Sequence, residues 1–238
     1  MSYKDKFIGR PGLRFQEYTQ KKRLSLLNLN SFLEVLNIAE IGVGAGLITS
    51  QIAKTKHNYT GFEPDQELRN RLVNNFLSDK CNIREEPLPF INIESQFDIV
   101  ILINVLEHSE SHIEAKKWVS NVHKMLKPSG KLLTICPDYE SFGKIFYSID
   151  STHGYVTSKE RVIELVSGLN FSLKQFKFER AGSTNILIRL MASLGKAFFP
   201  YRLMDHVILK LTGIPLIGQG IMSGIFLRYA IWIFEKNP

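Results

Sequence analysis

The chain has 238 residues, of which 44% are apolar and 22% are charged. This length supports one domain with an added segment or two small domains, and the composition excludes a wholly disordered chain. Only two cysteines occur, Cys81 and Cys136, so a disulfide framework is excluded. No apolar run reaches about 18 residues, and no apolar stretch follows the N-terminal charges, so neither a membrane-spanning helix nor a secretory signal is predicted. We therefore expect a cytoplasmic protein.

Charge is unevenly distributed along the chain. The 30 Lys and Arg residues outnumber the 23 Asp and Glu residues, which gives a formal net charge of +7. Residues 1–23 and 189–238 carry this excess around a slightly acidic centre. Basic ends favour phosphate-bearing partners such as nucleic acid, anionic lipid or a nucleotide sugar, but they are equally typical of solvated surfaces. Nucleic acid is the least favoured of these partners, because the basic residues do not form a stripe with interleaved aromatic residues.

Apolar runs alternate with helical spacing along most of the chain. The runs predict buried strands, and the other segments have apolar side chains one helical turn apart. The predicted strands lie at 35–41, 59–62, 97–103, 131–136, 171–179 and 228–234, and the predicted helices lie at 14–35, 47–54, 66–76, 113–126 and 158–165. Strands that alternate with helices form right-handed βαβ units. The sequence therefore predicts an α/β fold that is Rossmann-like and doubly wound, with a mostly parallel sheet.

Residues 183–226 interrupt this alternation. They contain apolar stripes at helical spacing, and residues 211–227 carry no charge. We expect a helical lead-in at 1–34, a core at 35–182, an apolar helical insertion at 183–226 and a closing edge strand at 227–238. Three roles are open for the insertion: a lid buried over an apolar substrate, a contact with an anionic membrane surface or a lipid-linked substrate, or a homodimer contact. The membrane role would make the protein peripheral at the inner membrane face.

Three closely spaced glycines follow the first predicted strand, in Glu40-Ile-Gly-Val-Gly-Ala-Gly46. Glycine at a strand-to-helix turn lets the backbone approach a ligand, and the helix behind it offers unpaired N–H groups. A dinucleotide fingerprint would need glycine at the position of Leu47. Glu63 ends the next predicted strand, where a carboxylate can accept both ribose hydroxyls of an adenosine. The pattern therefore predicts a nucleoside site.

Four motifs in order resemble those of the class I S-adenosylmethionine-dependent methyltransferases, especially the small-molecule branch. They are the glycine loop and the segments 61–65 (Gly-Phe-Glu-Pro-Asp), 97–108 (Phe-Asp-Ile-Val-Ile-Leu-Ile-Asn-Val-Leu-Glu-His) and 126–135. The resemblance implies about seven strands with the last one antiparallel, and S-adenosyl-L-methionine as the cofactor. The residues that it implies for the cofactor are Glu40, Gly42, Gly44 and Gly46, then Glu63 with Pro64 and Phe62, then Glu86 or its neighbour Glu85, and finally Asn104.

Two histidines, His108 and His153, are candidate general bases, because an imidazole titrates near neutral pH. A base is needed only where the methyl acceptor must lose a proton, and a structural role is the alternative for each. Asp138 and Tyr139 are candidate substrate contacts, because ligands bind at the carboxyl ends of the strands in open sheets. Glu107 is predicted to begin the helix that follows it.

No pair of Cys or His residues has metal-ligand spacing, so no metal is expected. The other histidines are predicted at the surface: His57, His112, His123 and His206. The leading hypothesis is methyl transfer to a small-molecule acceptor by in-line displacement, with a sugar, a lipid-linked compound or another apolar metabolite as the acceptor. The alternatives are methylation of nucleic acid or protein, and a non-catalytic scaffold that binds S-adenosylmethionine.

Overall fold

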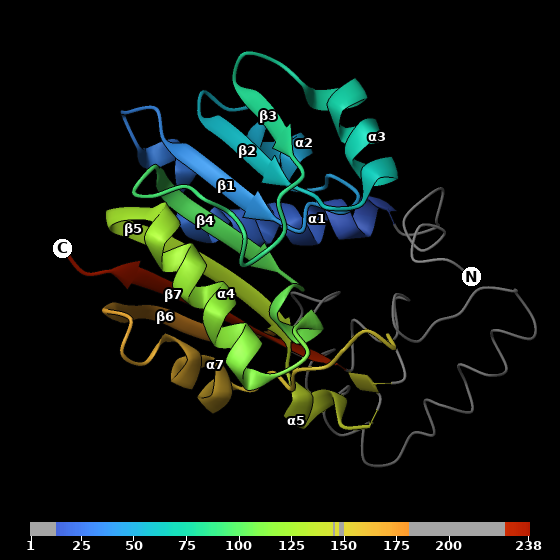
Figure 1. The fold of residues 1–238 in the computed structure, drawn as a ribbon. Coiled ribbons are helices and arrows are strands. Elements are labelled where there is room, and N and C mark those ends of the chain that lie inside the picture. Colours follow the sequence, from blue (N-terminus) through green and yellow to red (C-terminus); the bar gives the residue numbers. More distant parts are fainter. Residues whose placement is uncertain (1–12, 145, 148–149, 181–226) are drawn as a thin grey trace, which may run out of the picture.

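A computed structural model describes residues 13–144, 146–147, 150–180 and 227–238. The predicted insertion at 183–226 lies outside the described residues, as does the beginning of the lead-in. Within the described part of the chain, one sheet has the strand order β3-β2-β1-β4-β5-β7-β6 (Figure 1). The strands are β1 (Asn37–Ile41), β2 (Asn58–Phe62), β3 (Cys81–Arg84), β4 (Phe97–Ile103), β5 (Leu126–Pro137), β6 (Phe171–Arg180) and β7 (Arg228–Lys236).

The sheet is parallel from β3 to β5, and β7 runs antiparallel to both of its neighbours. The predicted α/β, Rossmann-like fold with a mostly parallel sheet is therefore confirmed. Strand order reverses at β1, which pairs with β2 on one side and with β4 on the other. In open α/β sheets, ligands bind beyond the carboxyl ends of the strands at such a switch point. The topology thus points to the loop that follows β1.

The prediction that the closing strand lies at the sheet edge is wrong. β7 lies between β5 and β6, where Trp232 pairs with Thr134 on one side and with Phe176 on the other. Ala230 to Phe234 are all buried, so this strand is apolar on both faces. An interior strand needs that pattern, whereas an edge strand is usually more polar. β6 is the true edge, and most of its residues are half-buried or exposed.

Helices cover the sheet, and hydrogen bonds from backbone N–H groups to side chains mark where several of them begin. Asp65 accepts from Leu68, Ser111 from Glu114 and Ser158 from Arg161, which satisfies one free N–H at each helix start. The helices are α1 (Leu13–Leu24), α2 (Thr49–Ile52), α3 (Gln66–Phe76), α4 (His112–Met125), α5 (Tyr139–Phe142) and α7 (Lys159–Val166), with the 3₁₀ turns η2 (Ser25–Leu27), η3 (Leu29–Ser31) and η4 (Leu106–His108).

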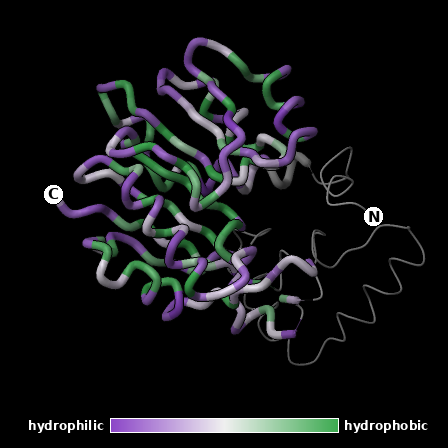
Figure 2. The backbone as a smooth tube through the Cα atoms, in the orientation of Figure 1, coloured by the Kyte–Doolittle hydropathy of each residue, from purple (hydrophilic) through white to green (hydrophobic). Residues whose placement is uncertain are grey.

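Both faces of the sheet are packed. Alternate residues of β4 show the division: Val100 and Leu102 join the core beneath α4 and α7, while Ile99 and Ile101 join the opposite core near α1. Figure 1 shows α4 and α7 in front of the sheet and α1 behind it, and Figure 2 shows apolar residues concentrated along the central strands. Because strands buried on both faces are held rigidly, the loops at their carboxyl ends have a firm support.

The lead-in is tied to the core by buried polar contacts. Arg23 donates from Nε to Glu179 Oε2 at 2.8 Å, and both side chains are buried. His57, predicted at the surface, is instead buried: its Nδ1 accepts from the Leu36 N–H at 3.1 Å, and its Nε2 lies 3.1 Å from the Leu29 carbonyl oxygen. These bonds connect the lead-in to the start of β1. No helix among the described residues is long and apolar enough to cross a membrane.

Candidate functional site

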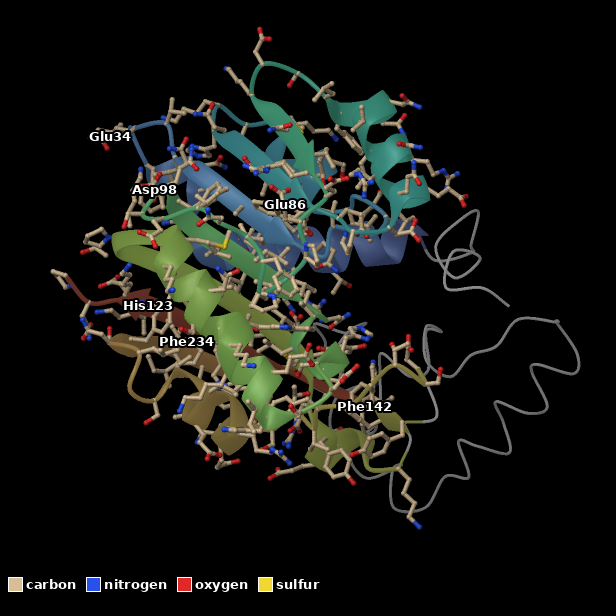
Figure 3. The ribbon with its side chains drawn as sticks, viewed as in Figure 1. Glu34, Glu86, Asp98, His123, Phe142 and Phe234 are labelled. Atoms are coloured by element: carbon tan, nitrogen blue, oxygen red, sulfur yellow. The ribbon has the colours of Figure 1, made fainter. Side chains whose placement is uncertain are left out.

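The predicted site residues gather at one edge of the sheet. The register aligns Ile41 with Phe62 and with Leu102, so β1, β2 and β4 end at the same level. The glycine loop and Glu63 therefore start side by side, and Asn104 follows on the other flank of β1. Figure 3 labels Glu34 and Asp98 near the amino ends of the strands and Phe142 near the opposite, carboxyl edge. The site is thus assembled from loops that the chain places far apart in sequence.

The glycine loop has the backbone geometry that glycine permits. Gly44 and Gly46 adopt φ values of +57° and +74°, in the left-handed region that other residues avoid. A Cβ added to Gly46 would lie 2.6 Å from Leu72 Cδ2, so this glycine lets the loop pack against α3. A Cβ added to Gly44 would meet nothing within 4 Å. Gly44 therefore faces an open space, which is what a loop that receives a ligand requires.

Glu63 lies directly against this loop. One carboxylate oxygen accepts from the Gly44 N–H at 2.8 Å, and the other accepts from the Asp65 N–H at 3.0 Å. The side chain is 6% exposed, and burial raises its pKa above the ordinary value of a glutamate. A carboxylate oxygen has a second lone pair, so each can still accept a hydroxyl. The residues present therefore fit the ribose of S-adenosylmethionine.

Glu40, which the resemblance assigns to the cofactor, is buried and hydrogen-bonded within the core. Its carboxyl group is 4% exposed and accepts a short hydrogen bond from the Tyr59 hydroxyl, which lies 2.8 Å from Thr49 Oγ1. Burial raises the pKa of Glu40 to about 8, so the group is protonated at neutral pH. This buried cluster of Glu40, Tyr59 and Thr49 supports the end of β1 and the start of the glycine loop from inside the core.

The residues proposed near the adenine are held in different ways. Phe62 is fully buried, so its ring is covered by protein. The Arg84 guanidinium lies 5.6 Å from the centre of that ring and makes an ion pair with Glu86, which lowers the pKa of Glu86. Pro64 is exposed, and its carbonyl accepts from Arg69 at 3.0 Å. Pro64 is therefore accessible beside Glu63, whereas Glu86 is paired with Arg84.

Asn104 follows β4 in a left-handed conformation, with φ of +55°. Asparagine tolerates this region better than most residues. Its N–H donates to the Ile135 carbonyl at 2.8 Å, which continues the pairing of β4 with β5, and its side chain is exposed. Asn104 thus lies on the rim of the site, where the resemblance placed it.

His108 and His153, far apart in sequence, are neighbours in the fold. The N–H groups of Gly154 and Tyr155 donate to the Glu107 carbonyl at 2.9 and 3.1 Å. A Cβ on Gly154 would lie 2.6 Å from the Ser109 carbonyl oxygen, so only glycine allows this approach. The two imidazole rings consequently lie 5.0 Å apart in an edge-to-face arrangement. This contact joins the loop after β4 to the loop before α7.

Hydrogen bonds fix the protonated nitrogen of each imidazole. Thr152 donates its hydroxyl to Asp150 Oδ1 at 2.7 Å, so it receives a proton from His108 Nδ1, which lies 2.7 Å from Thr152 Oγ1. His153 Nδ1 lies 2.7 Å from the Phe146 carbonyl oxygen, which can only accept. Both rings therefore carry their proton on Nδ1 in the neutral state, and Nε2 holds the basic lone pair. Sequence reasoning missed Thr152, although the Asp-Ser-Thr segment before His153 is typical of a tight turn.

Glu107 does not begin a helix, contrary to the prediction. It lies in the η4 turn, and α4 starts only at His112 after the Ser111 cap. The Glu107 side chain is fully buried, and neither carboxyl oxygen has a hydrogen-bond partner among the described residues. Burial raises its pKa to about 8, against the opposing effects of its own backbone N–H and of the nearby Cys136 thiol. Among the described residues, this buried acid lies beside two histidines with neither oxygen hydrogen-bonded.

Asp138 and Tyr139, predicted to touch the acceptor, have different surroundings. Asp138 is fully buried and accepts from Arg228 Nε at 2.6 Å. Burial raises its pKa, although the hydrogen bond and charge of Arg228 act against the rise. Tyr139 is half-buried and packs edge-to-face on Phe146 and Tyr147. Asp138 therefore anchors β7 to the loop after β5, and Tyr139 belongs to an aromatic cluster beside His153.

Residues 39–132 match a family described as a methyltransferase domain. The ribosomal RNA small subunit methyltransferase A of Pediococcus pentosaceus is 34% identical over 96 residues, which cover 39% of this chain and 28% of that protein. The mitochondrial ubiquinone biosynthesis O-methyltransferase of Dictyostelium discoideum is 26% identical over 133 residues, which cover 50% of this chain and 40% of that protein. The matches thus span less than half the length of these curated relatives.

The fold has close counterparts among solved structures. A SAM-dependent methyltransferase from Archaeoglobus fulgidus superposes with a TM-score of 0.63 at 19% identity, and the superposition covers 98% of each chain. At this identity the likeness shows the fold and no more than the fold.

Proposed function

We propose that this chain, which carries a class I S-adenosylmethionine-dependent methyltransferase domain, transfers the methyl group of that cofactor to a small-molecule acceptor. The observation that carries the proposal is the Glu63 carboxylate, held at 2.8 Å from the Gly44 N–H beside the open side of the glycine loop. In this fold, that position receives the ribose of an adenosine.

The cofactor would be held by the backbone of residues 42–46, by the Glu63 carboxylate and by the rim that contains Pro64 and Asn104. S-adenosylmethionine supplies a methyl group on a positively charged sulfur. The protein contributes to catalysis by orienting the acceptor in line with the methyl group and by excluding water.

We place the acceptor against His108 and His153, at the same edge of the sheet. The aromatic rings of Tyr139, Phe146 and Tyr147 pack together there, and the Phe146 ring lies 4.7 Å from the His153 ring. An aromatic wall favours an acceptor with an apolar or planar body. The basic Nε2 atoms favour an acceptor group that must lose a proton, such as a hydroxyl. These two features together support an apolar hydroxyl compound as the substrate class.

Nucleic acid is the second candidate acceptor, because one relative is named as a ribosomal RNA methyltransferase. The small molecule is preferred, because other relatives are named as ubiquinone biosynthesis O-methyltransferases and the aromatic cluster suits such a compound. Contact of the 183–226 segment with a lipid-linked substrate, an anionic membrane or a second copy of the chain stays a prediction from the sequence, as does the cytoplasmic location.

The test has two steps. Isothermal titration with S-adenosylmethionine should show one site, and Glu63→Gln should weaken binding by roughly tenfold or more, because a charge-assisted hydrogen bond is lost. Glu34→Gln, which changes an exposed glutamate in the same way, is the matched control and should bind as the unaltered chain does. Equal affinity of Glu63→Gln and the unaltered chain would remove Glu63 from the site.

The second step incubates the protein with cell extract and methyl-labelled S-adenosylmethionine, followed by separation into lipid, polymer and small-molecule pools. We expect label in the lipid or small-molecule pool. Label in nucleic acid or protein would favour the second candidate. Binding of the cofactor without transfer to any pool would indicate a scaffold protein rather than an enzyme.

A further inference from the structure

Three groups that bind cations converge where the loop after β4 meets the loop before α7. Glu107, His108 and His153 each offer one ligand atom, and these atoms all lie within 4.8 Å of one another. The cluster is not apparent in the sequence, because 44 residues lie between His108 and His153. The hydrogen bonds from Gly154 and Tyr155 to the Glu107 carbonyl bring the loops together, so the cluster is a built part of the fold.

The position of the proton on each imidazole favours binding of a cation. Each carries its proton on Nδ1 and directs it to an oxygen, which belongs to Thr152 for His108 and to Phe146 for His153. Histidines that bind metals usually show this arrangement, because the outer hydrogen bond fixes the ring and leaves Nε2 as the ligand atom. Asp150 strengthens it for His108 by accepting from the Thr152 hydroxyl.

Glu107 provides an independent observation. Its carboxyl group is fully buried, and neither oxygen has a hydrogen-bond partner among the described residues. A buried acid in this condition is costly unless a cation or a proton satisfies it. Ionised Glu107 and the two neutral imidazoles each offer an acceptor atom, so a cation that replaces the Glu107 proton would be bound by all three.

We propose that Glu107, His108 and His153 bind a divalent first-row transition-metal cation. Two imidazole nitrogens with one carboxylate are typical ligands of zinc, iron and cobalt, whereas magnesium and calcium prefer oxygen ligands. In a tetrahedral site with bonds of about 2.1 Å, the ligand atoms lie roughly 3.4 Å apart. Binding therefore requires the side chains to draw together, which the two partly exposed imidazoles permit. Three protein ligands leave a fourth position open.

The catalytic role of the cation rests on the proposed function. Binding of the cation to the three side chains does not depend on that function. An acceptor hydroxyl at the open position would lose its proton more readily, because a bound cation lowers the pKa of an oxygen ligand. The O–H bond breaks and the proton passes to solvent. The oxygen then forms a bond to the methyl carbon while the carbon–sulfur bond breaks, and that electron pair stays on sulfur. With the cation bound, the Nε2 atoms are its ligands, so the cation replaces the imidazoles as the group that promotes loss of the proton.

The experiment titrates Co²⁺ into the full, chelator-treated chain and follows both heat and visible absorption. We expect one equivalent to bind, with the absorption of a nitrogen- and oxygen-ligated site, and Zn²⁺ should displace it. His153→Gln and Glu107→Gln should each weaken binding by tenfold or more. His123→Gln, which removes an imidazole near the far end of α4, is the matched control and should bind Co²⁺ unchanged.

Absence of saturable binding to the unaltered chain would overturn the proposal, and so would an equal loss of binding in the His123 control. Retention of full affinity by His153→Gln would overturn it as well. If Glu107→Gln does not fold, His153→Gln and the stoichiometry of the unaltered chain decide the matter. Titration of the same samples with S-adenosylmethionine separates the two proposals, because loss of cofactor binding with intact Co²⁺ binding would contradict the proposed function alone.

Discussion

Glu40 should make the protein less stable as the pH rises. Its carboxyl group is buried against Tyr59, and burial raises its pKa from 4.5 to about 8. Between these values the unfolded chain has released the proton and the folded chain still holds it. Since the folded state binds more protons there, the free energy of unfolding falls with increasing pH. The loss begins near pH 4.5 and is complete above about pH 8.

The magnitude follows from the size of the shift. One pKa unit corresponds to about 1.4 kcal/mol, so this single group contributes a slope of up to about 1.4 kcal/mol per pH unit and a total of roughly 5 kcal/mol. Glu40→Gln imitates the protonated form, and its amide oxygen can still accept from the Tyr59 hydroxyl. The variant should therefore gain stability relative to the unaltered chain as the pH rises, by up to about 4 kcal/mol between pH 5 and pH 8.

Urea unfolding at a series of pH values, followed by circular dichroism, measures this difference. Glu107 also has a raised pKa, but it is present in both proteins and its contribution cancels. Glu34→Gln, at an exposed position, is the control and should run parallel to the unaltered chain. Parallel curves for Glu40→Gln and the unaltered chain would contradict a raised pKa of Glu40, because Glu40 would then titrate alike in the folded and unfolded states.

The two other predictions concern the glycine loop and the buried ion pair. Gly46→Ala should lower the melting temperature markedly, because its Cβ would lie 2.6 Å from Leu72 Cδ2, whereas Gly44→Ala should cost only about 1 kcal/mol of backbone strain. Gly44→Ala should instead weaken binding of S-adenosylmethionine in titration calorimetry, and equal effects of the two variants on both measurements would contradict this division. Arg228→Met should destabilise the fold by about 3 kcal/mol in urea unfolding, because it leaves Asp138 buried without its cation. An unchanged unfolding midpoint would show that Asp138 does not depend on Arg228.

The strands could be predicted from the sequence because they are buried on both faces. The apolar run at 97–103 coincides with β4, and Asp65 and Ser158 cap helices as their positions suggested. The position of β7 could not be predicted, because burial of a strand does not reveal which neighbours it pairs with. The edge assignment therefore failed although the strand itself was recognised.

The candidate site likewise has one part that the sequence predicts and another that it does not. Glu63 and the glycine loop follow adjacent strands, so parallel pairing alone brings them together. The contact of His108 with His153 depends instead on a glycine that lets one loop approach another, and no local pattern records that approach. The burial of Glu40 and Glu107 could not be predicted for a related reason. Whether a carboxyl group faces solvent or the core depends on which face of the chain the remaining elements cover.

The position of β7 between β5 and β6 affects how readily the chain aggregates while it is being synthesised. Until residues 228–236 leave the ribosome, β5 and β6 have no strand between them, and β5 presents an apolar, unpaired margin. Such a margin is prone to association with other chains. A nascent or truncated polypeptide that ends before Arg228 should therefore need a chaperone, and removal of residues 228–236 should lead to aggregation in inclusion bodies.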